Sequence, residues 1–283
     1  MVATSACLDP VQARELGVTL VPLRVSIDGK DLLDVEEVSP REVVRLARNG
    51  VDLKTSSPSP GDYTAAFEAE PGPVLCLSEA SGVTAINSAA RVAAEIVGAG
   101  RVEVVDTGTA AGGLRLLALE AARLAGEGRG LAEVKERVSV LAARVQVVGM
   151  LETVEFLARS GRIPEIAHWG ASLLRVRPVV RFQPPGGSLV ALARSQLKGV
   201  RELHAAAIRD VRKQAGGPCG EGAHCSVFHG DAAGLAGELL DQLGRELPHA
   251  ELSVCEVTAA MIVHTGPGLV GYALYVDPPP GGG

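Results

Sequence analysis

The chain has 283 residues, a formal net charge of −6, 47% hydrophobic residues and only 3% aromatic residues. This composition supports a sizeable buried core and argues against a disordered chain. It also argues against a nucleic-acid-binding protein, because such proteins rely on basic surfaces and aromatic stacking. The length predicts about two domains.

Neither a membrane span nor a secretory signal is expected. No uninterrupted apolar run reaches the ~18 residues that a membrane helix needs. Met1 to Pro10 lacks the basic and apolar regions of a signal peptide. The five cysteines are odd in number and scattered, which favours reduced thiols over a disulfide framework. We therefore expect a cytoplasmic protein.

Strands and helices alternate in the first half of the chain. A cap-like Ser39 precedes Pro40, where the spacing predicts a helix start. The runs 18–27, 74–77 and 102–105 predict strands, the segments 40–48, 83–96, 112–124 and 131–144 predict helices, and the polar stretch 52–60 predicts a loop. This alternation indicates an α/β domain with a mostly parallel sheet, which we place at residues 1–144.

The second half has the pattern of a mixed sheet with helices. The segment 183–188, with two prolines and two glycines, predicts a hairpin turn. The patterns predict strands at 145–151, 178–182, 189–193, 225–228, 251–257 and 269–276, and helices at 154–159, 197–214 and, with Asp231 as its cap, 231–243. We expect a second α/β domain at residues 145–277, followed by a disordered tail at 278–283.

The segment Lys54 to Pro60 gathers four hydroxyl side chains in seven residues. One interpretation is a turn in which Ser59 caps the following helix. The other is a cluster of donors at a helix N-terminus that binds a carboxylate or phosphate, with Thr55 and Ser56 as ligand-binding residues.

The segment Ser78 to Thr84 follows a predicted buried strand and precedes a helix, where open α/β sheets bind ligands. Ser81 and Gly82 are the candidates, although Ser81 or Thr84 would also serve as a helix cap. No standard phosphate-binding glycine motif occurs in the chain.

A third candidate is His264, in the segment His264-Thr-Gly-Pro-Gly268 after an apolar run that we interpret as a strand. The following turn would hold the imidazole rigidly, and an imidazole titrates near neutral pH. An incidental histidine beside a turn is the simpler alternative. Cys219, His224 and Cys225 have poor spacing for zinc, so we expect neither a metal nor a cofactor.

Taken in order, six segments resemble the DegV family of bacterial fatty-acid-binding proteins. They are Val21-Pro-Leu23 with Ile27-Asp-Gly29, Thr55-Ser-Ser-Pro-Ser59, Ser81-Gly82 with Asn87-Ser-Ala89, Val105-Asp106, Leu151-Glu152 with Ser160-Gly-Arg-Ile163, and Val263-His-Thr-Gly-Pro-Gly268. The chain departs from the family where Ala3-Thr-Ser-Ala6 lacks an aspartate and where Ser160 replaces a glycine.

The resemblance implies a carrier with two α/β domains and a buried apolar tunnel for a long-chain fatty acid. It implies that the fatty acid carboxylate lies where Thr55, Ser81 and His264 converge. A separate ATP-dependent fatty acid kinase subunit would phosphorylate that carboxylate, and the carrier would hold the acyl phosphate. Catalysis would then belong to the kinase. We assign Arg162 and Arg194 to docking of that partner.

Two other functions stay open from the residues alone. Thr55 or Ser81 with His264 would form a nucleophile and base for acyl transfer or ester hydrolysis, although no G-x-S-x-G motif is present. Alternatively, His264 would anchor a carbonyl substrate covalently, as in the substrate subunits of dihydroxyacetone kinases.

Overall fold

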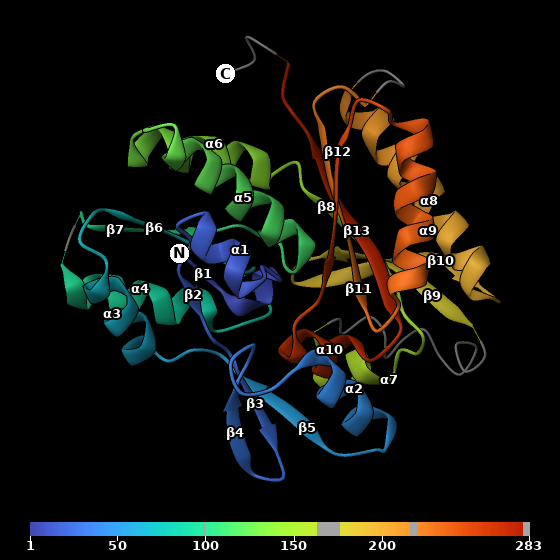
Figure 1. The fold of residues 1–283 in the computed structure, drawn as a ribbon, viewed down its shortest axis with the longest axis horizontal. Coiled ribbons are helices and arrows are strands. Elements are labelled where there is room, and N and C mark those ends of the chain that lie inside the picture. The colour runs from blue at the N-terminus through green and yellow to red at the C-terminus, as the bar shows by residue number, and fades with distance from the viewer. Residues whose placement is uncertain (99, 163–175, 216–219, 280–283) are drawn as a thin grey trace. The chain divides into compact units, whose positions relative to one another are not determined.

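The computed structural model describes residues 1–98, 100–162, 176–215 and 220–279 (Figure 1). Two compact units divide the chain. Unit 1 comprises Met1–Ala143 and Thr258–Val263, and unit 2 comprises Arg144–Val257 and His264–Gly283. Both combine strands with helices, so the predicted α/β class is confirmed. Of the predicted tail, residues 280–283 lie outside the described part of the chain.

Unit 1 is built on a four-stranded parallel sheet in the order β2-β1-β6-β7. The central strand β6 is the apolar run expected from the sequence, and its side chains are mostly buried. Figure 1 shows α3 and α4 on one face of this sheet and α5 and α6 on the other. The elements are β1 (Val2–Ala3), β2 (Leu20–Val21), β6 (Val74–Ser78), β7 (Val102–Asp106), α3 (Pro60–Ala69), α4 (Ile86–Val97), α5 (Gly112–Gly126) and α6 (Leu131–Ala142).

A second, antiparallel sheet of unit 1 was not predicted. It has the order β4-β3-β5, with β3 (Arg24–Ile27), β4 (Lys30–Leu33) and β5 (Leu53–Ser56). The single strand expected over 18–27 divides into β2 and β3, because Pro22 lacks the amide needed to continue a ladder. The loop expected over 52–60 is wrong for residues 53–56, since β5 pairs with β3. The remaining elements are η1 (Thr4–Ala6), α1 (Pro10–Glu15) and the correctly expected α2 (Pro40–Arg48).

Unit 2 contains a six-stranded mixed sheet in the order β10-β9-β8-β13-β11-β12. Every neighbouring pair is antiparallel except β11 with β12. The predicted hairpin joins β9 and β10. The strands are β8 (Gln146–Met150), β9 (Arg177–Gln183), β10 (Gly186–Ala193), β11 (Ala223–Gly230), β12 (Glu251–Glu256) and β13 (Leu269–Val276).

Two long helices cover one face of this sheet and form the core of unit 2. They are α8 (Gln196–Ala215) and α9 (Ala233–Glu246). Their buried side chains, among them Leu203 and Leu239, pack with Val148 and Tyr272 of the sheet. On the other face of the strands, Phe228 contacts the paired glycines Gly149 and Gly271, and a Cβ at Gly271 would lie 2.5 Å from the ring. The shorter helix α7 (Glu155–Ser160) also belongs to unit 2. The helix α10 (Ala259–Thr265) is divided, with residues 259–263 in unit 1 and residues 264–265 in unit 2.

Three helix predictions need correction. Helix α4 begins at Ile86 and not beside Gly82. Asp231 does not cap α9, because its φ of 59° places it in the left-handed region, whereas a cap residue is normally extended. The run before His264 is the helix α10 and not a strand. Such a short apolar run fits both structures, and Gly266, with a φ of 75°, provides a typical helix end.

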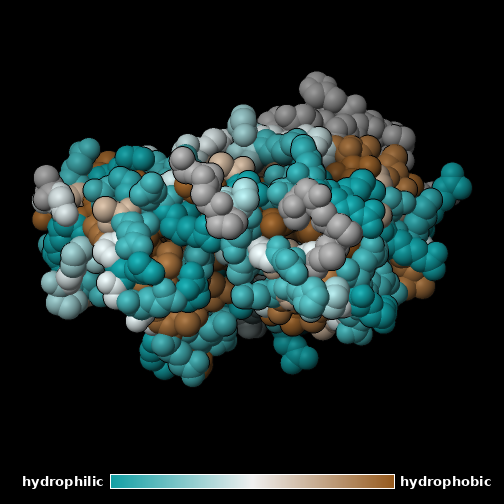
Figure 2. Space-filling model, turned by 90° about the horizontal axis from the view of Figure 1, so that it is seen from above, coloured by the Kyte–Doolittle hydropathy of each residue, from teal (hydrophilic) through white to brown (hydrophobic). Residues whose placement is uncertain are grey.

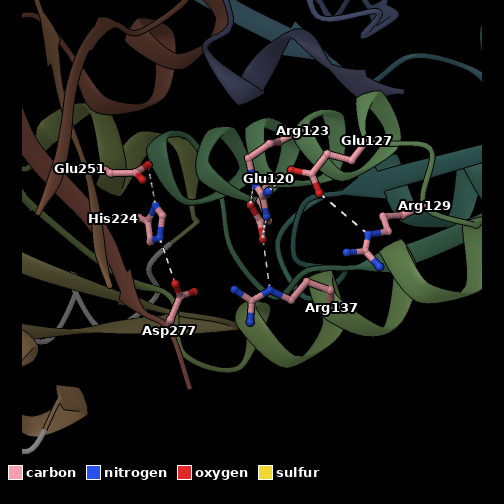
Figure 3. A network of polar contacts seen from close by, with 8 residues as sticks. All are labelled: Glu120, Arg123, Glu127, Arg129, Arg137, His224, Glu251 and Asp277. Atoms are coloured by element: carbon pink, nitrogen blue, oxygen red, sulfur yellow. Dashed lines mark hydrogen bonds and ion pairs between the residues drawn. The ribbon is translucent and has the colours of Figure 1, made fainter. Parts of the chain in front are cut away.

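Charged side chains are paired within each unit (Figure 3). In unit 1, the buried carboxylate of Glu120 on α5 is 2.8 Å from Arg123 and 3.1 Å from Arg137 on α6. Burial raises the pKa of Glu120, but the hydrogen bonds from Arg123 and Arg137 outweigh this effect and leave it below its usual value. The pairing therefore joins α5 to α6.

In unit 2, the ring nitrogens of His224 lie 3.1 Å from Glu251 and 3.4 Å from Asp277, and its ring stacks on Tyr275. Cys225 is the next residue along β11 and lies in the core, on the opposite face of the strand. His224 and Cys225 therefore cannot share a zinc ion. Cys219 lies outside the described residues.

Hydrophilic residues prevail on the surface seen in Figure 2, with separate apolar patches between them. Among the described helices, none combines the length and apolar character that a membrane crossing requires.

Candidate functional site

The first predicted segment begins on the strand β5. Thr55 is half-buried opposite Val25 of β3, and Ser56 is exposed opposite Arg24. Neither lies at a helix N-terminus, so that part of the prediction is wrong. The β-branched side chain of Thr55 suits this strand position.

The end of the same segment has a structural role. The hydroxyl of Ser59 accepts a hydrogen bond from the amide of Asp62 at 3.2 Å, and the Asp62 carboxylate accepts one from the Ser59 amide at 2.7 Å. This reciprocal capping box starts α3. Arg24 holds the same carboxylate with two hydrogen bonds of 2.9 Å, and its hydrogen bond holds the pKa of Asp62 well below its usual range. The capping interpretation is therefore confirmed for Ser59.

The second segment, between β6 and α4, lies beside the first. The hydroxyls of Ser57 and Thr84 are 3.2 Å apart, which joins the two loops directly. The amide of Ser81 donates to the carboxylate of Asp106 at 3.2 Å, and that carboxylate also accepts from the Gly108 amide. Asp106 ends β7 and the second segment follows β6, so these two motifs meet at the carboxyl ends of parallel strands, where open sheets bind ligands. The first segment, which follows the antiparallel strand β5, contacts them through Ser57.

Buried hydrogen bonds fix the start of this loop. The hydroxyl of Ser78 accepts from the Asn87 side chain at 2.7 Å, and the Ser78 carbonyl accepts from the Thr107 hydroxyl at 2.8 Å. Ser81 and Gly82 are exposed, and the Ser81 hydroxyl has no hydrogen bond to another described residue. The loop is thus anchored at Ser78 while Ser81 presents a hydroxyl.

The third segment packs within unit 2 against the segment that begins at Leu151. A Cβ on Gly266 would lie 2.3 Å from the Phe156 ring, and one on Gly268 would lie 2.5 Å from the Glu152 carboxylate. Both glycines have φ near 80° (75° and 82°). Only glycine permits this close approach without strain. The tight packing brings together two motifs that are over 100 residues apart in sequence.

His264 occupies the last turn of α10, next to this glycine turn. Burial lowers the pKa of His264, and the positive charge of Arg162 lowers it further, to about 4. The imidazole is therefore neutral at pH 7 without a ligand. Arg162, which we assigned to docking, donates to the Ser160 carbonyl at 2.6 Å and acts electrostatically on His264. Sequence reasoning missed this link, because α10 and the end of α7 are distant in sequence.

The predicted residues thus fall into two groups. Thr55, Ser56, Ser81 and Gly82 belong to unit 1, whereas His264, Arg162 and Arg194 belong to unit 2. Arg194 is exposed just after β10. A separate cavity of unit 1, about 410 Å³, is lined largely by apolar residues that include Leu75, Ala122 and Val134. None of the five predicted ligand-binding residues lines it.

Comparison with known proteins agrees with the motifs. A family model described as uncharacterised proteins of the DegV family matches residues 1–277. The chain belongs to the DegV family. A DegV domain-containing protein of Deinococcus radiodurans is 31% identical over 94% of both chains. DegV membership, inferred from six short motifs, is therefore confirmed.

Solved structures of fatty-acid-binding proteins share the fold. A DegV family protein from Thermus thermophilus, described as fatty acid binding, has 28% identity and a TM-score of 0.89 over 98% of both chains. A stearic acid-binding protein from Eubacterium ventriosum has 20% identity and a TM-score of 0.87 over 97% of both chains. At that identity the second likeness concerns the fold alone.

Proposed function

We propose that this DegV protein binds a long-chain fatty acid in a buried apolar tunnel and presents its carboxylate to a separate ATP-dependent fatty acid kinase. The protein then carries the acyl phosphate, and the kinase supplies the chemistry. The observation that carries the binding proposal is the loop after β6, which contacts both the loop after β5 and the end of β7, in a chain 28% identical to a fatty-acid-binding DegV protein.

The hydroxyls of Thr55 and Ser81 and the imidazole of His264 are the proposed carboxylate ligands, with Ser56 and Gly82 beside them. A buried carboxylate is costly unless it receives hydrogen bonds, and these groups are donors of the required kind. The acyl chain supplies the larger part of the affinity, since each buried methylene contributes about 0.8 kcal/mol before ordering costs.

Native mass spectrometry of the purified protein tests the ligand class. A noncovalent fatty acid that leaves on denaturation supports the carrier. An adduct that persists on denaturation contradicts it and supports an acyl-transfer enzyme or a covalent anchor at His264. Protein that is empty and also fails to bind added palmitate and oleate contradicts the proposal.

Thr55→Val is expected to weaken fatty acid binding by about 10- to 150-fold, because it removes one hydrogen bond to a charged group. Valine suits the strand β5, so the fold should be preserved. Titration with a fluorescent fatty acid measures the effect. Thr64→Val is the matched control, because its hydroxyl only donates to the Pro60 carbonyl within α3. Equal affinity of both variants and the wild type would remove Thr55 from the site.

Arg194→Glu is expected to slow acyl phosphate formation at least about tenfold while leaving the fatty acid Kd unchanged, because rim charges act mainly on association. The assay adds ATP and the kinase subunit encoded in the same genome to the loaded protein. Arg41→Glu, an exposed position of α2 in unit 1, is the control. Arg162→Glu should affect both steps, since its charge also acts on His264. Parallel loss of lipid and phosphorylation in Arg194→Glu would exclude a docking role.

A further inference from the structure

Asp34 is a fully buried carboxylate outside the site described so far. It follows β4 in unit 1. One carboxylate oxygen accepts a hydrogen bond from the Thr4 hydroxyl at 2.8 Å, and the other accepts one from the amide of Ala260 at 3.1 Å. Burying a carboxylate is costly, so these contacts indicate a specific role. They connect the 3-10 helix η1 to the first turn of α10.

The backbone around Asp34 is held in an unusual conformation. The Asp34 amide donates to the Leu23 carbonyl at 2.8 Å. The next residue, Val35, has a φ of 67°, which a β-branched residue rarely adopts. Such strain persists only where surrounding contacts enforce it. Here it accompanies a carboxylate that is directed at the start of α10.

Helix α10 provides a short path from Asp34 to His264. In an α-helix each carbonyl accepts from the amide four residues later, which pairs the Ala260 carbonyl with the His264 amide. The amide of Ala260 therefore donates to Asp34, and its carbonyl accepts from the amide of His264. The helix has the sequence AAMIVHT, so the residues between Ala260 and His264 are all apolar.

We propose that Asp34 is a positioning residue, which fixes the first turn of α10 and thereby the imidazole of His264. The proposal rests on the proposed function only in that His264 meets the fatty acid carboxylate. Asp34 itself does not touch the ligand. Its role is to hold the imidazole where burial and Arg162 keep it neutral before the ligand binds.

The test is the titration of His264 in ligand-free protein, followed by NMR of the ring and assigned with His264→Gln. Asp34→Ala is expected to raise the His264 pKa by about one unit or more, because a displaced ring regains solvent. Removal of the Asp34 charge would by itself lower the pKa of His264. A rise of this pKa would therefore show that the ring has moved. Asp34→Asn retains an oxygen that can accept from Ala260 and should restore most of the wild-type value.

Val43→Ala is the control for lost stability, because Val43 is a buried apolar residue of α2 in the same unit. It should leave the His264 titration unchanged. Where Asp34→Ala does not fold, Asp34→Ser replaces it, since its side chain is too short to reach Ala260. A folded Ala or Ser variant with an unchanged His264 titration overturns the proposal.

Fatty acid titration separates this proposal from the proposed function. Asp34→Ala and His264→Gln should each weaken binding, and the double variant should bind no more weakly than His264→Gln alone, because both changes act through the same ring. Additive losses would contradict the positioning role. If the wild type binds no fatty acid, the proposed function fails while the NMR result still decides the role of Asp34.

Discussion

Fatty acid binding by the wild-type protein is expected to tighten several-fold as the pH falls from about 7 to about 5, and His264→Gln is expected to remove the part of this gain that the imidazole supplies. Burial and Arg162 keep the pKa of His264 near 4 in the free protein. A carboxylate next to the ring raises that pKa, so binding takes up a proton in this pH range.

The His264→Gln variant is also the control for titration of the fatty acid itself, because that contribution is common to both proteins. Glutamine retains a donor of similar reach, so the variant should bind with a modest loss at pH 7 and present the carboxylate poorly to the kinase. His264→Ala should impair both binding and phosphorylation. An identical pH dependence in the wild type and the glutamine variant would show that His264 does not meet the carboxylate.

The same histidine affects the stability of the free protein. Its pKa is lowered from 6.5 to about 4 on folding, so the unfolded chain binds more protons between these values. Stability is therefore fully present above pH 6.5 and falls as the pH decreases toward 4, by up to about 3 kcal/mol. Urea unfolding at several pH values should show a smaller decrease for His264→Gln.

Gly266→Ala is expected to destabilise the protein by about 2–4 kcal/mol, the sum of a left-handed backbone cost and an overpacking cost. Gly266 has a φ of 75°, and the new Cβ would lie 2.3 Å from the Phe156 ring. Because this turn follows His264 directly, fatty acid affinity should fall as well. Urea unfolding and fatty acid titration measure the two effects.

Gly29→Ala provides a matched control for the backbone cost alone. Gly29 has a φ of 79°, and a Cβ there would meet nothing within 4 Å. The Gly29→Ala variant should lose only about 1 kcal/mol of its free energy of unfolding. In the double variant Gly266→Ala with Phe156→Ala, the new Cβ no longer meets a ring. The double variant should therefore lose less stability than the sum of the two single variants. Equal destabilisation by Gly29→Ala and Gly266→Ala would show that Phe156 does not constrain the turn.

The sequence predicted those elements whose residues carry their own signals. Ser39 and Pro40 define the start of α2. The apolar run at 74–77 is too short for a stable helix, so it predicts a buried strand. The two prolines and two glycines of segment 183–188 predicted the position of the β9–β10 hairpin. The six ordered motifs were sufficient for the family, because their order and spacing are specific even where each motif is weak.

The α/β class, the DegV family and the residue types available for a carboxylate site could thus all be predicted from the order of the residues alone. The folded chain was needed to show that Thr55 lies on a strand that pairs with β3. It was also needed to show that His264 lies on a helix whose first turn is hydrogen-bonded to Asp34. It also showed that Arg162 acts on His264. These outcomes depend on contacts between residues 30 or more positions apart, and local sequence patterns cannot predict which distant residues will be in contact.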